Sequence, residues 1–308
     1  MISEPLDILK HHPVRKCKRQ KEAFRQDIQG YCESIGYTVS FEKTPRGGQN
    51  ILIGDPKTAK YLITAHYDTS VRMLFGNHFC PKNLPVTIIL ALPTIVLFGV
   101  LGYLIGYHFA NGEVLKGFLC LTLFVALDLF KLYGPANGSN ANDNTSGVVT
   151  LLEIARTLQD NLRRNVCFVL FDMEEAGLVG SSAYRKAHKE ETEHQIVLNM
   201  DCVGDGDEIL LFPTKKFRKD GKKLAWLYKA IGRYGDKTID VPIKGYANFN
   251  SDQKNFPYGV GIAAFKRKKL IGLYVDRIHT PKDTVLEETN VNILRACLTS
   301  LVACDAAE

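Results

Sequence analysis

The chain has 308 residues, 45% of them hydrophobic and 23% charged, which is enough for one large domain and excludes a disordered tail. Lys and Arg exceed Asp and Glu by only 39 to 33, so nucleic acid is not expected as a partner. The eight cysteines form no CxxC pair and suit a reducing compartment.

The segment before residue 84 has the pattern of an α/β protein. Apolar residues recur at helical spacing in 14–36, which predicts a helix there. Three β-like runs follow it, at 37–42, 50–53 and 61–65. Residues 1–30 contain no apolar h-region, so no signal peptide is expected.

Residues 84–133 form an apolar block that differs from the rest of the chain. Its charged residues are Glu113, Lys116, Asp128 and Lys131. Its first part, Leu84–Ala110, contains no Asp, Glu, Lys or Arg and would span roughly 40 Å as a helix, more than the ~30 Å hydrocarbon core of a bilayer. A polar turn at 111–113 separates it from a second apolar part at 117–133. We therefore expect a membrane-spanning helical hairpin, the alternative being a helical pair buried in the core of a soluble protein.

Strand and helix patterns alternate again after the block. Two continuous apolar runs, 165–171 and 195–200, are typical of strands covered on both faces. Helical spacing recurs in three segments, at 146–158, 179–188 and 291–303. This order predicts a three-layer α/β/α sandwich with a mixed, mostly parallel central sheet, interrupted by the inserted pair of hydrophobic helices. Residues 1–83 and 134–308 would form one discontinuous domain, with 84–133 as an inserted hairpin that anchors it to the membrane.

Side chains suited to chemistry follow several of the apolar runs. The loops at the carboxyl ends of strands are where an α/β sheet builds its active site. Six motifs concentrate His, Asp and Glu at such positions: His66-Tyr67-Asp68, Asn142-Asp143-Asn144, Glu174-Glu175, Asn199-Met200-Asp201, Ser251-Asp252-Gln253 and His279-Thr280-Pro281. The first three motifs have structural alternatives: a structural histidine for His66, a helix cap for Asp143 or Asn144, and a solvated loop for the two glutamates.

The motifs together offer a set of metal ligands. Its members are two imidazoles and three carboxylates: His66, His279, Asp143, Glu175 and Asp201. Nitrogen and oxygen donors of this kind suit Zn²⁺, with Mn²⁺ and Co²⁺ as substitutes, and a shared carboxylate would make a two-metal hydrolytic site. Adjacent glutamates after a strand point in different directions, so one can bind a metal while the other handles a proton, and Glu174 is left over from the ligand set.

The ordered motifs HYD, NDN-SG, EE-GL-GS, NMD, SD and HTP-DT make the chain resemble a known family. This family is the co-catalytic zinc aminopeptidases of the aminopeptidase Y and bacterial leucyl aminopeptidase type, to which the glutaminyl cyclases are related. The resemblance covers nearly the whole chain outside the apolar block. It implies two zinc ions bridged by Asp143. One ion would also bind His66 and Asp201, and the other would bind Glu175 and His279.

Three catalytic roles are implied by the same resemblance. Glu174 matches the general base, and Asp68 matches the carboxylate that contacts the metal-binding His66. Tyr246 matches a tyrosine that steadies the oxyanion in some members.

Two departures from the family stand out. Asp143 follows His66 by 77 positions, most of them filled by the apolar block, and Gln253 stands where the family usually has His.

The function implied by the resemblance is that of a metal-dependent exopeptidase, an aminopeptidase acting on peptides with a free N-terminus. Residues 1–83 and 134–308 would then form its zinc exopeptidase catalytic domain. One alternative is a glutaminyl cyclase-like aminoacyltransferase with a single zinc, against which the compact segment 174–182 argues. Another is an inactive membrane scaffold of the same fold. Such relatives generally lack ligands, whereas all five are present here.

The placement of the block predicts a membrane topology. Residues on both sides of it have to meet at one metal pair, so the chain must cross the bilayer an even number of times. Thirteen Lys and Arg lie in residues 1–83, with Arg72 and Lys82 close to the first span. The positive-inside rule therefore places the domain in the cytoplasm, with the lipid bilayer as a partner of residues 84–133.

Overall fold

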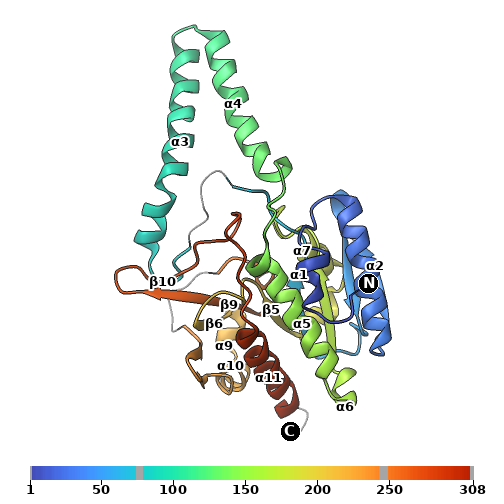
Figure 1. The fold of residues 1–308 in the computed structure, drawn as a ribbon. Helices are drawn as coiled ribbons and strands as arrows, with labels where there is room; N and C mark the ends of the chain where they lie inside the picture. The colour runs from blue at the N-terminus through green and yellow to red at the C-terminus, as the bar shows by residue number, and fades with distance from the viewer. Residues whose placement is uncertain (1, 74–78, 243–248, 306–308) are drawn as a thin grey trace.

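The fold is built around one mixed β-sheet with helices on both faces (Figure 1). The computed structural model describes residues 2–73, 79–242 and 249–305. Strands from both sides of the apolar block pair in this sheet. β3 (Tyr61–His66), which precedes the block in the chain, lies between β4 (Val166–Phe171) and β5 (Ile196–Met200), which follow it. The predicted α/β class is confirmed.

The sheet is parallel at its centre and antiparallel toward its edges. Its other strands are β1 (Val39–Lys43), β2 (Gln49–Ile53), β6 (Glu208–Pro213), β7 (Gly232–Tyr234), β8 (Lys237–Asp240), β9 (Tyr258–Lys268) and β10 (Gly272–Tyr274). The order is β1-β2-β4-β3-β5-β9-β6-β8-β7, with β10 paired to β9. Parallel pairing joins β4, β3, β5 and β9 in turn, and also β6 to β8. The prediction of a mixed sheet is right, but β1–β2, β7–β8 and β9–β10 are hairpins, whose short turns require antiparallel strands, so parallel pairing is confined mainly to the centre.

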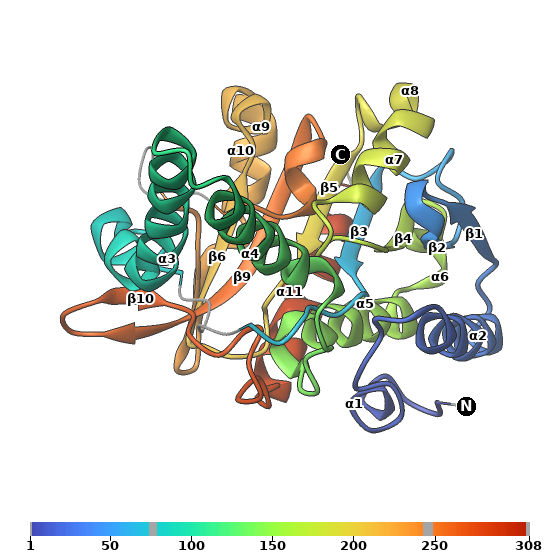
Figure 2. The same ribbon diagram turned by 90° about the horizontal axis from the view of Figure 1, so that it is seen from above.

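Helices cover both faces of the sheet and complete the three layers. Outside the apolar block they are α1 (Asp7–His11), α2 (Lys18–Ser34), α5 (Ser146–Thr157), α6 (Asp160–Arg163), α7 (Val179–Ala187), α8 (Lys189–Thr192), α9 (Lys215–Lys219), α10 (Gly221–Tyr228) and α11 (Glu288–Asp305). Adjacent residues of β4 point to opposite faces: Phe168 packs in the core cluster shared with α2, α5 and α11, whereas Val169 packs with Tyr184 of α7. Figure 2 shows α2, α5 and α11 on one side of the sheet and α7 and α8 on the other.

The apolar block folds as two helices that project from one end of the domain (Figure 1). These are α3 (Leu84–Ala110) and α4 (Val114–Tyr133), and they pack on each other through ring contacts such as Phe98 with Phe124. Of the 24 large hydrophobic side chains exposed in the described part of the chain, 20 lie in these two helices. The alternative that the pair is buried in the core of the domain is therefore wrong.

The two helices differ in how well their composition suits a membrane span. By length and composition α3 is a candidate span, and it is the single one among the described residues. Each window of α4 long enough for such a span contains Lys116, Asp128 and Lys131. The sequence-based expectation of two apolar spans is thus met by one helix, with α4 as a more polar companion.

Candidate metal centre

Three neighbouring parallel strands deliver candidate ligands to one edge of the sheet. His66 is the last residue of β3, Asp201 directly follows β5, and the pair Glu174 and Glu175 follows β4 after two intervening residues. Because the carboxyl ends of parallel strands meet at the same edge, these side chains converge although they are far apart in the sequence.

Two further candidate ligands come from loops. Asp143 lies in the turn η2 (Ala141–Thr145) before α5, where the backbone leaves the helical conformation with φ −112° and ψ 95°. His279 follows β10 in a loop where its own φ is 60°, in the left-handed region that non-glycine residues seldom adopt. The His279 carbonyl accepts a hydrogen bond from the backbone N–H of Met73 at 3.0 Å, which connects this loop to the segment entering the hairpin.

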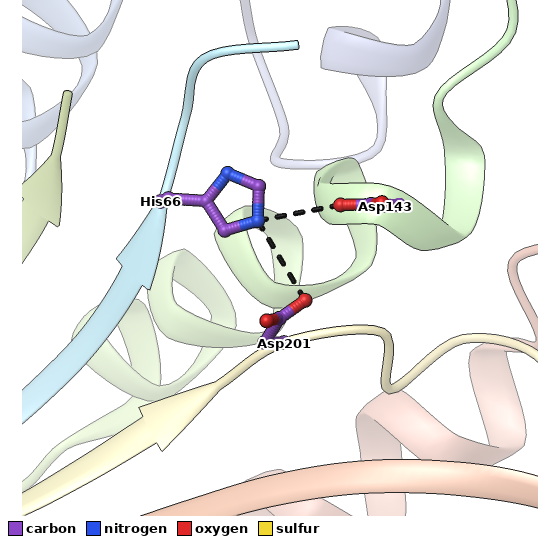
Figure 3. A group of neighbouring side chains, drawn as sticks. All are labelled: His66, Asp143 and Asp201. Atoms are coloured by element: carbon purple, nitrogen blue, oxygen red, sulfur yellow. Dashed lines mark ion pairs between the residues drawn. The ribbon is translucent and has the colours of Figure 1, made fainter. Parts of the chain in front are cut away.

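The carboxylate of Asp143 lies between the two histidines. Its Oδ1 is 3.3 Å from Nε2 of His66, and its Oδ2 is 2.9 Å from Nε2 of His279. Asp201 approaches Nε2 of His66 at 3.6 Å, as Figure 3 shows, and Glu175 approaches Nε2 of His279 at 3.3 Å. The five side chains thus form two three-residue groups that share Asp143.

The chemistry of this donor set fits divalent cations. Within each group the candidate ligand atoms all lie within 4.8 Å of one another. Among the described residues, the buried Oε1 of Glu175 and Nδ1 of His279 have no hydrogen-bond partner. Burial lowers the pKa of His66 and of His279, but the carboxylates outweigh it and hold both pKa values well above the ordinary value. The site therefore attracts positive charge, and imidazole nitrogen with carboxylate oxygen is typical of zinc.

Asp68 connects the first histidine to the two glutamates. Its carboxylate accepts hydrogen bonds from the backbone N–H groups of Glu174 at 3.0 Å and Glu175 at 3.3 Å. Its backbone carbonyl lies 3.2 Å from Nδ1 of His66, closer than the 3.6 Å of its carboxylate. Burial raises the pKa of Glu174 well above its ordinary value, and the charges of Glu175 and Asp201 act in the same direction. Asp68 thus holds the backbone of Glu174 and Glu175 beside the first histidine.

Side chains with no predicted role hold the Asp143 turn in place. The carboxylate of Asp283 accepts hydrogen bonds from the backbone N–H of Asn142 at 2.8 Å and of Asp143 at 3.0 Å. Asn144 accepts from the Gly147 N–H at 3.1 Å inside the first turn of α5. Asn144 thus bonds the first turn of α5, whose N-cap residue is Thr145, and Asp143 is left facing the histidines. The motif around His279 contains Asp283, but the sequence alone offers no sign of this contact.

Arg15 is a second buried residue that sequence reasoning missed. Its Nε donates to the Tyr67 carbonyl at 2.5 Å, and a terminal nitrogen donates to the hydroxyl of Thr145 at 3.0 Å. Burial lowers its pKa to about 10, and the charges of Asp68 and Asp143 oppose this effect. Arg15 therefore links the loop after β3 to the turn before α5.

The Ser251-Asp252-Gln253 segment makes hydrogen bonds to β5, the strand that Asp201 follows. Gln253 is buried, donates to the carbonyl of Phe249 at 2.9 Å and accepts from Asn199 at 3.3 Å. Burial raises the pKa of Asp252 to about 7. Tyr246, the expected oxyanion residue, lies outside the described residues.

The fold and the site together define an α/β protein with a metal-binding centre at the carboxyl edge of its sheet. The sequence profile of Peptidase family M28 matches residues 127–302, more than half of the chain, and the chain belongs to this family. The matched range contains four of the five candidate ligands and begins inside α4. His66 and Asp68 precede it, on the far side of the hairpin.

The chain is also similar to individual proteins. Aminopeptidase YwaD of Bacillus subtilis is 40% identical over 67 residues, a stretch that spans 21% of this chain but only 15% of that relative. A Zn-dependent exopeptidase from Parabacteroides distasonis has a TM-score of 0.60 at 15% identity, with 97% of this chain and 95% of that chain covered. A glutaminyl cyclase from Tannerella forsythia has a TM-score of 0.58 at 15% identity, with 97% and 96% covered. At such identities the similarity of the two structures shows a shared fold.

Proposed function

We propose that this protein is a metal-dependent aminopeptidase, a hydrolase that removes N-terminal residues from peptides with a free N-terminus. The observation that carries the proposal is the position of Asp143 between His66 and His279. Two ligand groups that share one carboxylate are the arrangement a pair of co-catalytic ions requires, and the family of the chain is a peptidase family.

The proposed centre holds two zinc ions per chain. Asp143 would bridge them, with His66 and Asp201 completing one site and Glu175 and His279 the other. Zinc supplies a Lewis acid that polarises a peptide carbonyl and lowers the pKa of water. Mn²⁺ and Co²⁺ accept the same ligand types and are the expected substitutes.

Glu174 is the proposed general base, because it follows a ligand-bearing strand and belongs to neither ligand group. Its carboxylate takes a proton from the attacking water as the new C–O bond forms. It then gives that proton to the amine nitrogen as the C–N bond breaks. The Asp68 carboxylate accepts the backbone N–H of Glu174. This bond keeps the proposed base at a constant position relative to β3, the strand that carries His66.

A glutaminyl cyclase-like aminoacyltransferase is the second candidate, because the Tannerella forsythia cyclase shares the fold. The compact segment 174–182 and the complete set of five ligands favour the peptidase over both the cyclase and an inactive membrane scaffold. Metal content distinguishes the three. Two tightly bound ions per chain support the peptidase, one supports the cyclase, and none supports the scaffold.

The hairpin is the proposed membrane anchor of a discontinuous catalytic domain on the cytoplasmic side. The segments entering and leaving it run side by side: Val71 forms a β-bridge with Ala136, and the Arg72 N–H donates to the Pro135 carbonyl at 2.9 Å. The neighbouring Met73 N–H donates to the His279 carbonyl, so the base of the hairpin is also bonded to the His279 loop. Insertion of α3 into a bilayer would therefore hold the mouth of the site near the lipid surface and favour short or membrane-proximal peptides.

The decisive experiment is an assay of the purified full chain on a panel of aminoacyl-aminomethylcoumarins, before and after dialysis against a chelator. We expect cleavage that the chelator abolishes and zinc restores. N-acetylated versions of the best substrate are the matched control and should not be cleaved. Formation of pyroglutamate from N-terminal glutamine without any hydrolysis would favour the cyclase, and inactivity on every substrate with metal bound would refute the aminopeptidase proposal.

A further inference from the structure

A pocket of about 560 Å³ lies between the metal centre and the C-terminal turn of α4. Asp68 and Glu175 line it from the metal centre, and Lys131, Leu132 and Tyr133 line it from the hairpin. Its volume is sufficient for an amino-acid side chain or a short peptide tail. Because Glu175 is a proposed metal ligand, a group bound in this pocket would lie next to the reacting carbonyl.

Four cations line the same pocket: Lys16, Lys21, Arg46 and Lys131. Two of them have a carboxylate partner. Lys21 is paired with the buried Asp172, and Lys131 is 2.9 Å from Asp128 on its own helix.

Within the described part of the chain, Lys16 and Arg46 have no carboxylate partner. The Nζ of Lys16 donates to the backbone carbonyl of Leu132 at 2.8 Å, and the carboxylates of Glu175 and Asp68 attract it without forming a direct ion pair. Arg46 is exposed in the turn between β1 and β2, with φ at 61°. Two carboxylates, Asp68 and Glu175, line the pocket against the four cations, so positive charge is in surplus among the lining residues. A concave site with surplus cations concentrates anions.

We propose that this pocket binds a carboxylate of the substrate, so that the enzyme prefers peptides with a carboxylate within about one residue of the scissile bond. The inference rests on the proposed aminopeptidase function and adds the substrate class. A peptide carboxylate fits better than a lipid headgroup, because Glu175 itself lines the pocket and a lipid held there would block the metal centre. The carboxylate has two sources: an acidic side chain at the N-terminus, or the C-terminus of a dipeptide.

Two substrate pairs distinguish these sources. Glutamyl- and leucyl-aminomethylcoumarin differ in the side-chain carboxylate, and Leu-Gly and Leu-Gly-amide differ in the C-terminal one. We expect kcat/KM to favour the anionic member of one pair by about tenfold. Equal rates within both pairs on an active enzyme would overturn the proposal and leave the aminopeptidase function standing.

Arg46→Glu tests the pocket with little risk to folding, because the side chain is exposed. It should lower the preference for the anionic substrate by about tenfold, and Lys16→Gln should lower it by a few-fold. Lys269→Glu is the matched control, since it makes the same charge change on an exposed residue outside the pocket. If Arg46→Glu and Lys269→Glu changed the preference equally, the effect would be one of net charge and the proposal would be wrong.

Cys17 provides a readout that needs no catalysis, because it is exposed and lines the pocket. In a Cys120→Ser, Cys304→Ser background, an anionic methanethiosulfonate should modify Cys17 several-fold faster than a cationic one. Arg46→Glu should remove this difference, and millimolar Glu-Gly should slow the reaction more than Leu-Gly-amide does. A labelling preference without peptidase activity would support the pocket and refute the proposed function. Protection by vesicles containing phosphatidylserine, but not by Glu-Gly, would assign the pocket to a lipid headgroup and overturn the proposal.

Discussion

Glu174 and Glu175 are neighbours with separate places in the site. Glu175 belongs to the ligand group of Asp143 and His279, whereas Glu174 belongs to neither group. Glu174→Gln should therefore keep its metal and its fold while kcat/KM falls by roughly 10²- to 10⁴-fold, the usual contribution of a general base. Glu175→Gln should lose about one equivalent of zinc by elemental analysis. The opposite pattern, with metal lost from Glu174→Gln alone, would reverse the two roles.

Asp283 touches no substrate in this scheme but holds a ligand in position. Both of its carboxylate oxygens accept backbone N–H groups of the Asp143 turn. Asp283→Asn points an amide N–H₂ at one of these donors, so we expect zinc affinity to fall about 10- to 100-fold, as is usual when a supporting residue is changed. Competition with a chromogenic chelator measures this affinity. Asp160→Asn, whose parent side chain is 93% exposed, is the control and should leave it unchanged.

At the scale of elements, an ion pair joins α7 to β1. Nε2 of His188 lies 2.6 Å from Glu42, and the imidazole stacks on Tyr184. The hydrogen bond to Glu42 raises the pKa of His188 above its ordinary value. A raised pKa in the folded state means that the contribution to stability is complete below the unfolded pKa of about 6.5 and disappears as pH rises through the folded pKa.

His188→Gln should therefore cost more in acid than in base. We expect a loss of about 1 kcal/mol in the free energy of unfolding at pH 6 and a smaller loss at pH 9. Urea titrations of the detergent-solubilised full chain at the two pH values measure the difference. An equal loss at both values would mean that packing on Tyr184, and not the charge of His188, carries the contribution.

At the scale of the whole molecule, the hairpin is separable from the sheet. Its two roots are already joined by the bridge between Val71 and Ala136, so a short connection can replace it without moving the metal ligands. Replacing residues 84–133 with a Gly/Ser loop should release a soluble protein that still cleaves neutral aminoacyl substrates. The wild-type chain should need detergent for extraction, and recovery of wild type in the soluble fraction would refute the membrane anchor.

The same replacement removes Lys131, Leu132 and Tyr133 from the pocket that we propose binds a substrate carboxylate. We expect the preference for anionic substrates to fall in the soluble version, because one wall of the pocket is lost. Asn111→Cys at the tip of the hairpin tests the orientation. An impermeant thiol reagent should label this cysteine from the side opposite the catalytic domain, and labelling from the cytoplasmic side alone would contradict a hairpin that crosses the bilayer.

The sequence by itself determined what depends on local pattern. His66, Asp143 and Asp201 stand in short motifs at the ends of apolar runs, and a fifty-residue block with four charges predicts a helical pair without any knowledge of contacts. Helices such as α5 and strands such as β3, β4 and β5 lie within a few residues of their predicted bounds. These features are readable because alternation and helical spacing are properties of neighbouring residues.

The tertiary structure decided what depends on residues distant in the chain. The contact of Arg15 with Thr145 spans 130 positions, and that of Asp283 with Asn142 spans 141. No local sequence pattern around Arg15 or Asp283 predicts these partners. The strands β6 to β10 and the antiparallel edges were not predicted, because short strands are defined by the neighbour that pairs with them. The charged pocket likewise exists only because folding brings Lys16 and Arg46 to Glu175 and to the end of α4. Local pattern thus predicted the candidate ligands, and long-range packing decided which residues support them and which residues line the pocket beside them.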